Sequence, residues 1–207
     1  MFQLLIWLVI LTPLLMGAGC RHAPPPATQT APPSPPSPTF EHPDQELLEE
    51  ALKGRGLSPV EVANLSDRLL AEGSPTFQNE RLMAQLDILL TKTLKGEQKE
   101  HRHRLLRNLG IIHYHQKKFS LARQELQQAN EIYPRDARTH FYLARLAVHQ
   151  GKIYQRKGLS KKAKGQFNLA SNELELARKF EPSNPLYRQN LKEFLDKEQP
   201  LPGDRKK

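Results

Sequence analysis

Residues 106–134, LRNLGIIHYHQKKFSLARQELQQANEIYP, decide the fold of this chain. Their apolar side chains recur at helical spacing, with little β-branched clustering and little period-two alternation. Gly110 and Ala122 are small enough for two antiparallel helices to approach closely, and we expect Leu126 to pack against the next unit. Pro134 ends the second helix, because proline cannot continue a helix. The stretch therefore predicts a helical hairpin.

The spacing of these residues resembles the tetratricopeptide pattern W-x2-L-G-x2-Y, then A-x3-F, then P. The resemblance covers residues 103–136, with Leu106 at the tryptophan position and His113 at the tyrosine position. It implies an all-α fold, a solenoid of stacked helical hairpins whose first helices line a concave groove. The matching positions are Leu106, Leu109, Gly110, His113, Ala122, Leu126, Ala129 and Pro134.

A second unit, residues 137–184, repeats the pattern at greater length. The interval from Gly110 to Pro134 in the first unit corresponds to the longer interval from Ala144 to Pro182 in the second. The excess divides equally on either side of Ala163, so each helix has gained seven residues, about two turns. We therefore expect a tetratricopeptide-like hairpin that projects beyond its neighbours and turns at Gly158.

The net charge of +9 is unevenly distributed. Residues 44–97 contain 6 Lys and Arg against 10 Asp and Glu, whereas residues 98–207 contain 24 against 11. No acidic residue lies between Asp136 and Glu173. A charged run is usually a solvated face, but one this long and one-sided favours an anionic partner. The basic residues expected at the tip of the long hairpin are Lys152, Arg156, Lys157, Lys161, Lys162 and Lys164.

Residues 1–19, MFQLLIWLVILTPLLMGAG, are uncharged and end in small residues before Cys20, the only cysteine. Pro13 and the small residues shorten the apolar helix to about the core of a signal peptide. The junction resembles the lipobox of bacterial lipoproteins, with Gly17 where leucine is usual. That resemblance implies cleavage before Cys20, diacylglycerol on its thiol, and a fatty acyl group such as palmitate on the new amino terminus. An uncleaved signal anchor with an incidental cysteine is the alternative.

Nine of the 17 prolines lie between residues 24 and 43. This proline-rich segment has almost no apolar side chains to bury, so we expect a disordered tether. The expected organisation is a lipoprotein signal peptide (1–19), an acylated cysteine and linker (20–43), an amino-terminal helical region of degenerate repeats or a cap (44–102), a tetratricopeptide repeat (103–136), an extended repeat (137–184), a capping helix (185–198) and a disordered tail (199–207).

The eight histidines do not predict a metal site. In the pairs His101/His103 and His113/His115 the residues are two apart, and on a helix they diverge by about 200°. The sequence also lacks a phosphate-binding loop, a nucleophile elbow and a dinucleotide fingerprint. We therefore expect no metal, no cofactor and no enzymatic activity. His113 occupies a packing position of the repeat and is expected to be partly buried.

The resemblance implies a partner-binding groove on the first helices of the two repeats. Arginine and tyrosine are common anchors of protein interfaces. The expected lining consists of Arg104, Arg107, Ile111, Tyr114 and His115, followed at the equivalent positions of the second unit by Arg138, Phe141, Arg145, Val148 and His149. The alternative is an ordinary solvated basic face.

Two functions follow from these features. The architecture is similar to pilotins and to assembly lipoproteins of pilus, secretion or outer-membrane machines, which implies an adaptor that holds envelope proteins through the groove. Such a protein is anchored by lipid in the bacterial cell envelope, and Arg21 after the cysteine favours the outer membrane facing the periplasm. In the other function, the basic tip binds an anionic surface, either lipid headgroups, lipopolysaccharide or a cell-wall polymer. Nucleic acid suits the charge but not an exported compartment, so we do not expect it.

Overall fold

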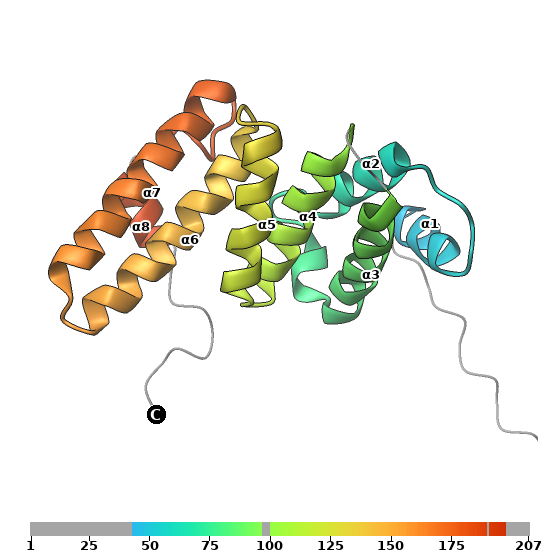
Figure 1. Ribbon diagram of the computed structural model, residues 1–207, viewed down its shortest axis with the longest axis horizontal. Helices are drawn as coiled ribbons and strands as arrows, with labels where there is room; N and C mark the ends of the chain where they lie inside the picture. The colour runs from blue at the N-terminus through green and yellow to red at the C-terminus, as the bar shows by residue number, and fades with distance from the viewer. Residues whose placement is uncertain (1–42, 97–99, 190, 198–207) are drawn as a thin grey trace, which may run out of the picture. The chain divides into compact units, whose positions relative to one another are not determined.

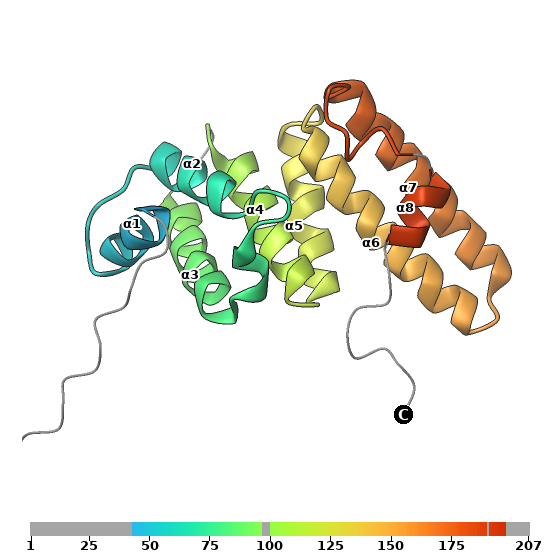
Figure 2. The same ribbon diagram turned by 180° about the vertical axis from the view of Figure 1, so that it is seen from behind.

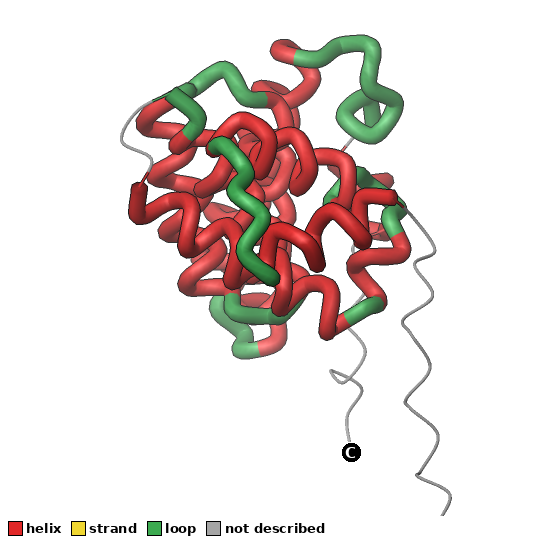
Figure 3. The backbone as a smooth tube through the Cα atoms, turned by 90° about the vertical axis from the view of Figure 1, so that its right-hand side faces the viewer, coloured by secondary structure: helices red, strands yellow, loops and turns green. Residues whose placement is uncertain are grey.

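The computed structural model describes residues 43–96, 100–189 and 191–197. This part of the chain consists of helices and loops without a strand (Figure 3), which confirms the all-α prediction. The expected signal peptide, Cys20, the tether and the tail lie outside the described residues. The elements are α1 (Pro43–Leu52), α2 (Pro59–Leu69), the 3₁₀ helix η1 (Pro75–Gln78), α3 (Glu80–Gly96), α4 (Arg102–His115), α5 (Phe119–Ile132), α6 (Ala137–Arg156), α7 (Ser160–Phe180) and α8 (Leu191–Lys197).

The helices α1, α2 and α3 pack on one another before the two long hairpins begin. A capping box fixes the start of α2: Ser58 accepts a hydrogen bond from the amide of Glu61, and the Glu61 carboxylate accepts one from the amide of Ser58. The sequence Ser-Pro-Val-Glu predicts this start, because proline suits the first turn of a helix. Leu48, Leu65 and Leu86 are fully buried at the centre of the three helices.

Two antiparallel hairpins follow, α4 with α5 and α6 with α7, and they stand side by side in chain order (Figure 1). The helices α4 and α5 have 14 residues each, whereas α6 has 20 and α7 has 21. Each hairpin closes over a glycine: a methyl group on Gly110 would lie 2.6 Å from Cγ of Leu126, and one on Gly151 2.5 Å from Cε1 of Phe167. Gly151 follows Gly110 by the same interval along the chain as Phe167 follows Leu126. The same close approach of backbones therefore recurs in both hairpins.

The turns of the two hairpins share one geometry. Lys117 and Gly158, which are separated by that same interval, both have a positive φ, of 63° and 71°. In each turn the next amide donates to a carbonyl five residues back, Lys118 to His113 at 2.8 Å and Leu159 to Tyr154 at 2.9 Å. This is the Schellman ending of a helix, which needs a left-handed residue. The long hairpin therefore turns at Gly158, where its sequence has the residue best suited to the turn.

The last helix begins later than expected. A helix was expected from residue 185, but α8 starts at Leu191. The side chain of Asn184 accepts from the amide of Leu186 at 3.1 Å, and its carbonyl accepts from the amide of Tyr187. This local turn replaces the helix start and directs Tyr187 into the core, where it is 2% exposed. The chain then returns across α6 and α7, so that α8 lies against them (Figure 2).

One hydrophobic core runs through all of these elements, from Leu48 of α1 to Phe194 of α8. The helices belong to a single compact unit, residues 39–207. This unit therefore contains all of the described core.

The different surroundings of Gly110 and Gly165 predict opposite effects of a change to alanine. Gly110→Ala places a methyl group against Leu126 and the backbone of Ala122, so overpacking exceeds the gain in helix propensity. We expect Gly110→Ala to lower the free energy of unfolding by about 1–2 kcal/mol, measured by urea denaturation. Gly165→Ala, in α7 with open space around the new methyl group, should raise it by about 0.5–1 kcal/mol. Equal effects at the two positions would contradict the packing seen here.

Candidate functional site

Arg107 of α4 forms a buried bridge between two carboxylates from different parts of the chain. Its guanidinium pairs with Asp67 of α2 and, through Nη1 at 2.7 Å from Oδ2, with Asp136. Asp136 also caps α6, since its Oδ1 accepts from the amides of Arg138 and Thr139 at 3.0 and 3.1 Å. The side chains of Arg107 and Asp136 are only 10% and 9% exposed, so this pair lies out of bulk water, whereas Asp67 is 27% exposed. The bridge ties α2, α4 and α6 together.

The carboxylate of Asp67 has two further partners. Arg104 donates to it from Nη2 at 2.6 Å, and the amide of Asn108 donates at 2.7 Å. Asn108 is fully buried and also donates to the hydroxyl of Ser66. Burial on its own raises the pKa of Asp67, but the charge of Arg107 and the hydrogen bonds from Arg104 and Asn108 outweigh burial and hold the pKa below its usual value.

Arg145 of α6 lies over a group of aromatic rings. Its guanidinium carbon is 4.7 Å from the centre of Tyr114 and 5.2 Å from that of Tyr142. Such cation–π contacts stabilise most where water is excluded, and the side chain of Arg145 is only 18% exposed. Glu72, in the loop after α2, completes the group with an oxygen 3.9 Å from Nη1. The positive charge of Arg145 is therefore satisfied within the chain.

His115 lies beside this group and is uncharged at neutral pH. Its ring stacks on Phe77 of η1 with centroids 3.8 Å apart, and its Nε2 lies 3.2 Å from the hydroxyl of Tyr142. Burial, with the charges of Arg145 and Arg138 added, lowers the pKa of His115 to about 3. His115 therefore acts as an aromatic packing residue with one polar contact.

The structure brings the expected groove residues together on one face of α4 and α6 and covers most of that face with the chain's own segments. Ile111 and Val148 are fully buried, and Phe141 packs against Tyr187 and Phe194, with ring centroids 5.0 and 5.6 Å away. Five further members keep partial exposure and have partners within the chain: Arg104 with Asp67, Arg138 with the carbonyl of Leu70, Arg145 with Glu72, His115 with Phe77, and His149 with the ring of Phe119. Arg107 and Tyr114 are buried.

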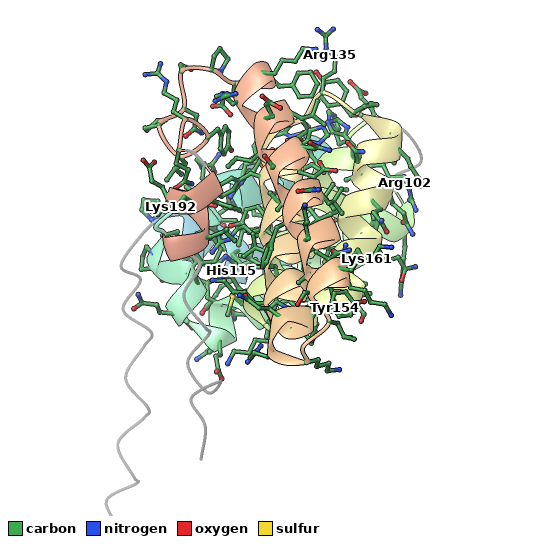
Figure 4. All side chains as sticks on the ribbon, turned by 90° about the vertical axis from the view of Figure 1, so that its left-hand side faces the viewer. Arg102, His115, Arg135, Tyr154, Lys161 and Lys192 are labelled. Carbon is green, nitrogen blue, oxygen red and sulfur yellow. The ribbon has the colours of Figure 1, made fainter. Side chains whose placement is uncertain are left out.

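The expected basic tip lies at the turn end of the long hairpin. Figure 4 places Tyr154 and Lys161 at this end and Arg135 at the opposite end. Lys152 is half-buried and donates from Nζ to the carbonyl of Leu195 at 2.9 Å, so it also holds α8 in place. The exposed members are Arg156, Lys157, Lys161, Lys162 and Lys164.

A charged histidine cluster was not predicted from the sequence. His113 of α4 is buried between Glu125 of α5, 2.6 Å from its Nδ1, and Asp87 of α3, 3.3 Å from its Nε2. Burial on its own lowers the pKa of His113, but the hydrogen bonds and charges of the two carboxylates outweigh it and raise the pKa to about 9. Lys118 lies 4.0 Å from the same Asp87. The cluster is therefore a charged link between α3, α4 and α5.

The described part of the chain contains neither a metal site nor a membrane span. It holds no group of three or more His, Cys, Asp or Glu placed to bind a metal ion. Among the described helices, none combines the length and the apolar character needed to cross a membrane. Comparison of the chain with protein-family models, with curated proteins and with solved structures finds no match.

The Arg107 bridge predicts a large loss of stability when the cation is removed. Arg107→Met leaves the carboxylate of Asp136, 9% exposed, without its buried counter-charge. We expect the free energy of unfolding to fall by about 3 kcal/mol in urea denaturation. Arg178→Met removes an exposed pair with Glu175 and should cost no more than about 0.5 kcal/mol. A loss at Arg107 as small as that at Arg178 would rule out the bridge as a stabilising element.

The His113 cluster predicts that stability falls on the alkaline side. Because the pKa rises from 6.5 to about 9 on folding, the stabilisation is complete below pH 6.5 and is lost as the pH rises through about 9. Over that range we expect the free energy of unfolding to decrease by about 3 kcal/mol at most. The His113→Gln variant should be less stable than the unmodified chain at pH 6, and its free energy of unfolding should change little up to pH 9. A shallow slope remains from His140, whose pKa the carboxylate of Glu173 also raises against burial. An unchanged slope in His113→Gln would contradict this assignment.

Proposed function

We propose that the chain is a lipid-anchored adaptor of the bacterial cell envelope, built on a tetratricopeptide-like helical solenoid. The observation that carries the proposal is the recurrence of one hairpin contact, Gly110 on Leu126 and Gly151 on Phe167, with the same turn geometry. Stacked hairpins of this kind create extended surfaces to which other proteins bind. The lipobox-like junction at Cys20 supports attachment to the membrane, and the proline-rich segment supports a tether between anchor and solenoid.

The exposed surface offers a concrete place for a partner. Ile132 and Tyr133 are neighbours at the end of α5, and they are 44% and 46% exposed. Exposed Arg135 follows two residues later, with its guanidinium 6.0 Å from the centre of the Phe180 ring. Adjacent apolar, aromatic and arginine side chains are typical of interface anchors. Because the face of α4 and α6 is largely covered by the chain itself, the end of α5 is a better first target for cross-linking and mutagenesis than Arg107 or Arg145.

Site-specific photo-crosslinking of the full-length chain in bacterial envelopes tests the proposal. A photo-reactive residue at Tyr133 should give one discrete cross-linked species, and Ile132→Asp should reduce its yield at least fivefold by removing apolar contact. The same probe at Gln124, also exposed on α5, is the matched control and should give little product.

The anchor is tested in the same cells. Cys20→Ala should release the chain from the membrane fraction, and mass spectrometry of the wild-type amino terminus should find a diacylated Cys20. Equal cross-linking from Tyr133 and Gln124 would argue against an adaptor surface at the end of α5. An intact Met1 would replace the lipoprotein by the signal-anchor alternative.

A further inference from the structure

Four exposed lysines lie close in sequence to one exposed leucine at the tip of the long hairpin. Leu159 follows the turn residue Gly158 and is 41% exposed, although it is apolar and lies in a loop of only three residues between α6 and α7. Lysines precede it and follow it in the chain, and all of them are exposed: Lys157, Lys161, Lys162 and Lys164. Among the described residues no acidic side chain forms an ion pair with any of the four.

These lysines have no carboxylate partner in the described part of the fold. Lys161 and Lys162 lie in the first turn of α7, which contains no acidic residue, so their charges oppose the helix dipole. Among the described rings, Tyr154 is the one that this group contacts, with Nζ of Lys162 5.9 Å from its centre. Arg104 and Arg107, in the body of the fold, are instead paired with carboxylates. Lysines without a carboxylate partner in the fold are available to pair with an external anion.

We propose that this tip, Lys157, Leu159, Lys161, Lys162 and Lys164, docks on a bilayer surface that contains anionic lipids. The lysines contact lipid phosphates, and Leu159 enters the layer between headgroups and acyl chains. The tip is a convex turn and not a groove, so it suits a broad deformable surface better than it suits a folded acidic protein. An exposed apolar side chain close to several cations is an arrangement by which peripheral segments bind membranes. The inference does not depend on the proposed adaptor function or on the anchor.

Vesicle co-sedimentation of residues 39–207 tests the docking, because this unit contains the whole described core and lacks the amino-terminal apolar segment. The unit should bind vesicles of phosphatidylcholine with phosphatidylglycerol, should not bind phosphatidylcholine alone, and should be released by high salt. Converting the four tip lysines to Gln should lower the partition coefficient by about fivefold per lysine, or two to three orders of magnitude together.

A matched variant separates the tip from the overall charge. Lys53, Lys92, Lys95 and Lys179 are exposed lysines outside the tip, and their conversion to Gln removes the same net charge. This control should bind nearly as well as the unmodified unit. Equal loss of binding in both variants would overturn the proposal in favour of diffuse attraction, and equal retention would overturn it as well. Circular dichroism and thermal unfolding confirm that each variant is folded.

A fluorescence measurement tests the role of Leu159 directly. The only tryptophan of the chain is Trp7, so residues 39–207 contain none, and Leu159→Trp introduces a single reporter. Its emission should shift to the blue and be quenched by brominated lipids when anionic vesicles are added. Leu159→Ser should weaken binding about fivefold, since the leucine is already partly buried in the free protein. Binding without a blue shift would overturn the proposed insertion of residue 159. Binding only to lipopolysaccharide or to an acidic protein would overturn the proposal that the ligand is an anionic lipid bilayer.

Discussion

The guanidinium of Arg107 holds three parts of the chain in place at once. It lies between Asp67 of α2 and Asp136 at the start of α6, and burial makes each charge costly unless its partner is present. Because Asp136 also caps α6, the position of the long hairpin is coupled to the position of α2. The bridge therefore fixes α2 against α4 and α6, while Phe77, Tyr187 and Phe194 cover other parts of that face.

The uneven charge along the chain is in part an internal complementarity. The acidic stretch 44–97 supplies the carboxylates of Asp67, Glu72 and Asp87, and the basic remainder supplies their partners in α4 and α6. These pairs neutralise basic side chains in the body of the fold. Around the turn at Gly158 the sequence offers no carboxylate, so the surplus charge gathers there. The basic tip is thus one of the places where positive charge is left without a neighbouring carboxylate.

The parts of the fold that could be predicted are those encoded by local spacing. Glycine, alanine and leucine at fixed intervals indicate which helix faces pack against each other, and the contact of Gly110 with Leu126 is an example. The covering of the groove face could not be predicted, because it depends on pairs far apart in the sequence, such as Arg107 with Asp67. The late start of α8 was missed because Asn-Pro is also compatible with the turn at Asn184 that directs Tyr187 inward. A pattern identifies a face, but the segment that covers it is decided by tertiary packing.

The length of the second hairpin is constrained by helix geometry. Seven residues are slightly less than two turns, so adding them rotates a helix face by only about 20°. Gly151 and Phe167 can therefore repeat the contact of Gly110 and Leu126 one heptad further along each arm, with the small residues still facing inward. An added length of five residues would have turned them toward solvent. Because both arms lengthen by nearly the same amount, the turn keeps its geometry and the lysines beside it are carried outward without any new core chemistry.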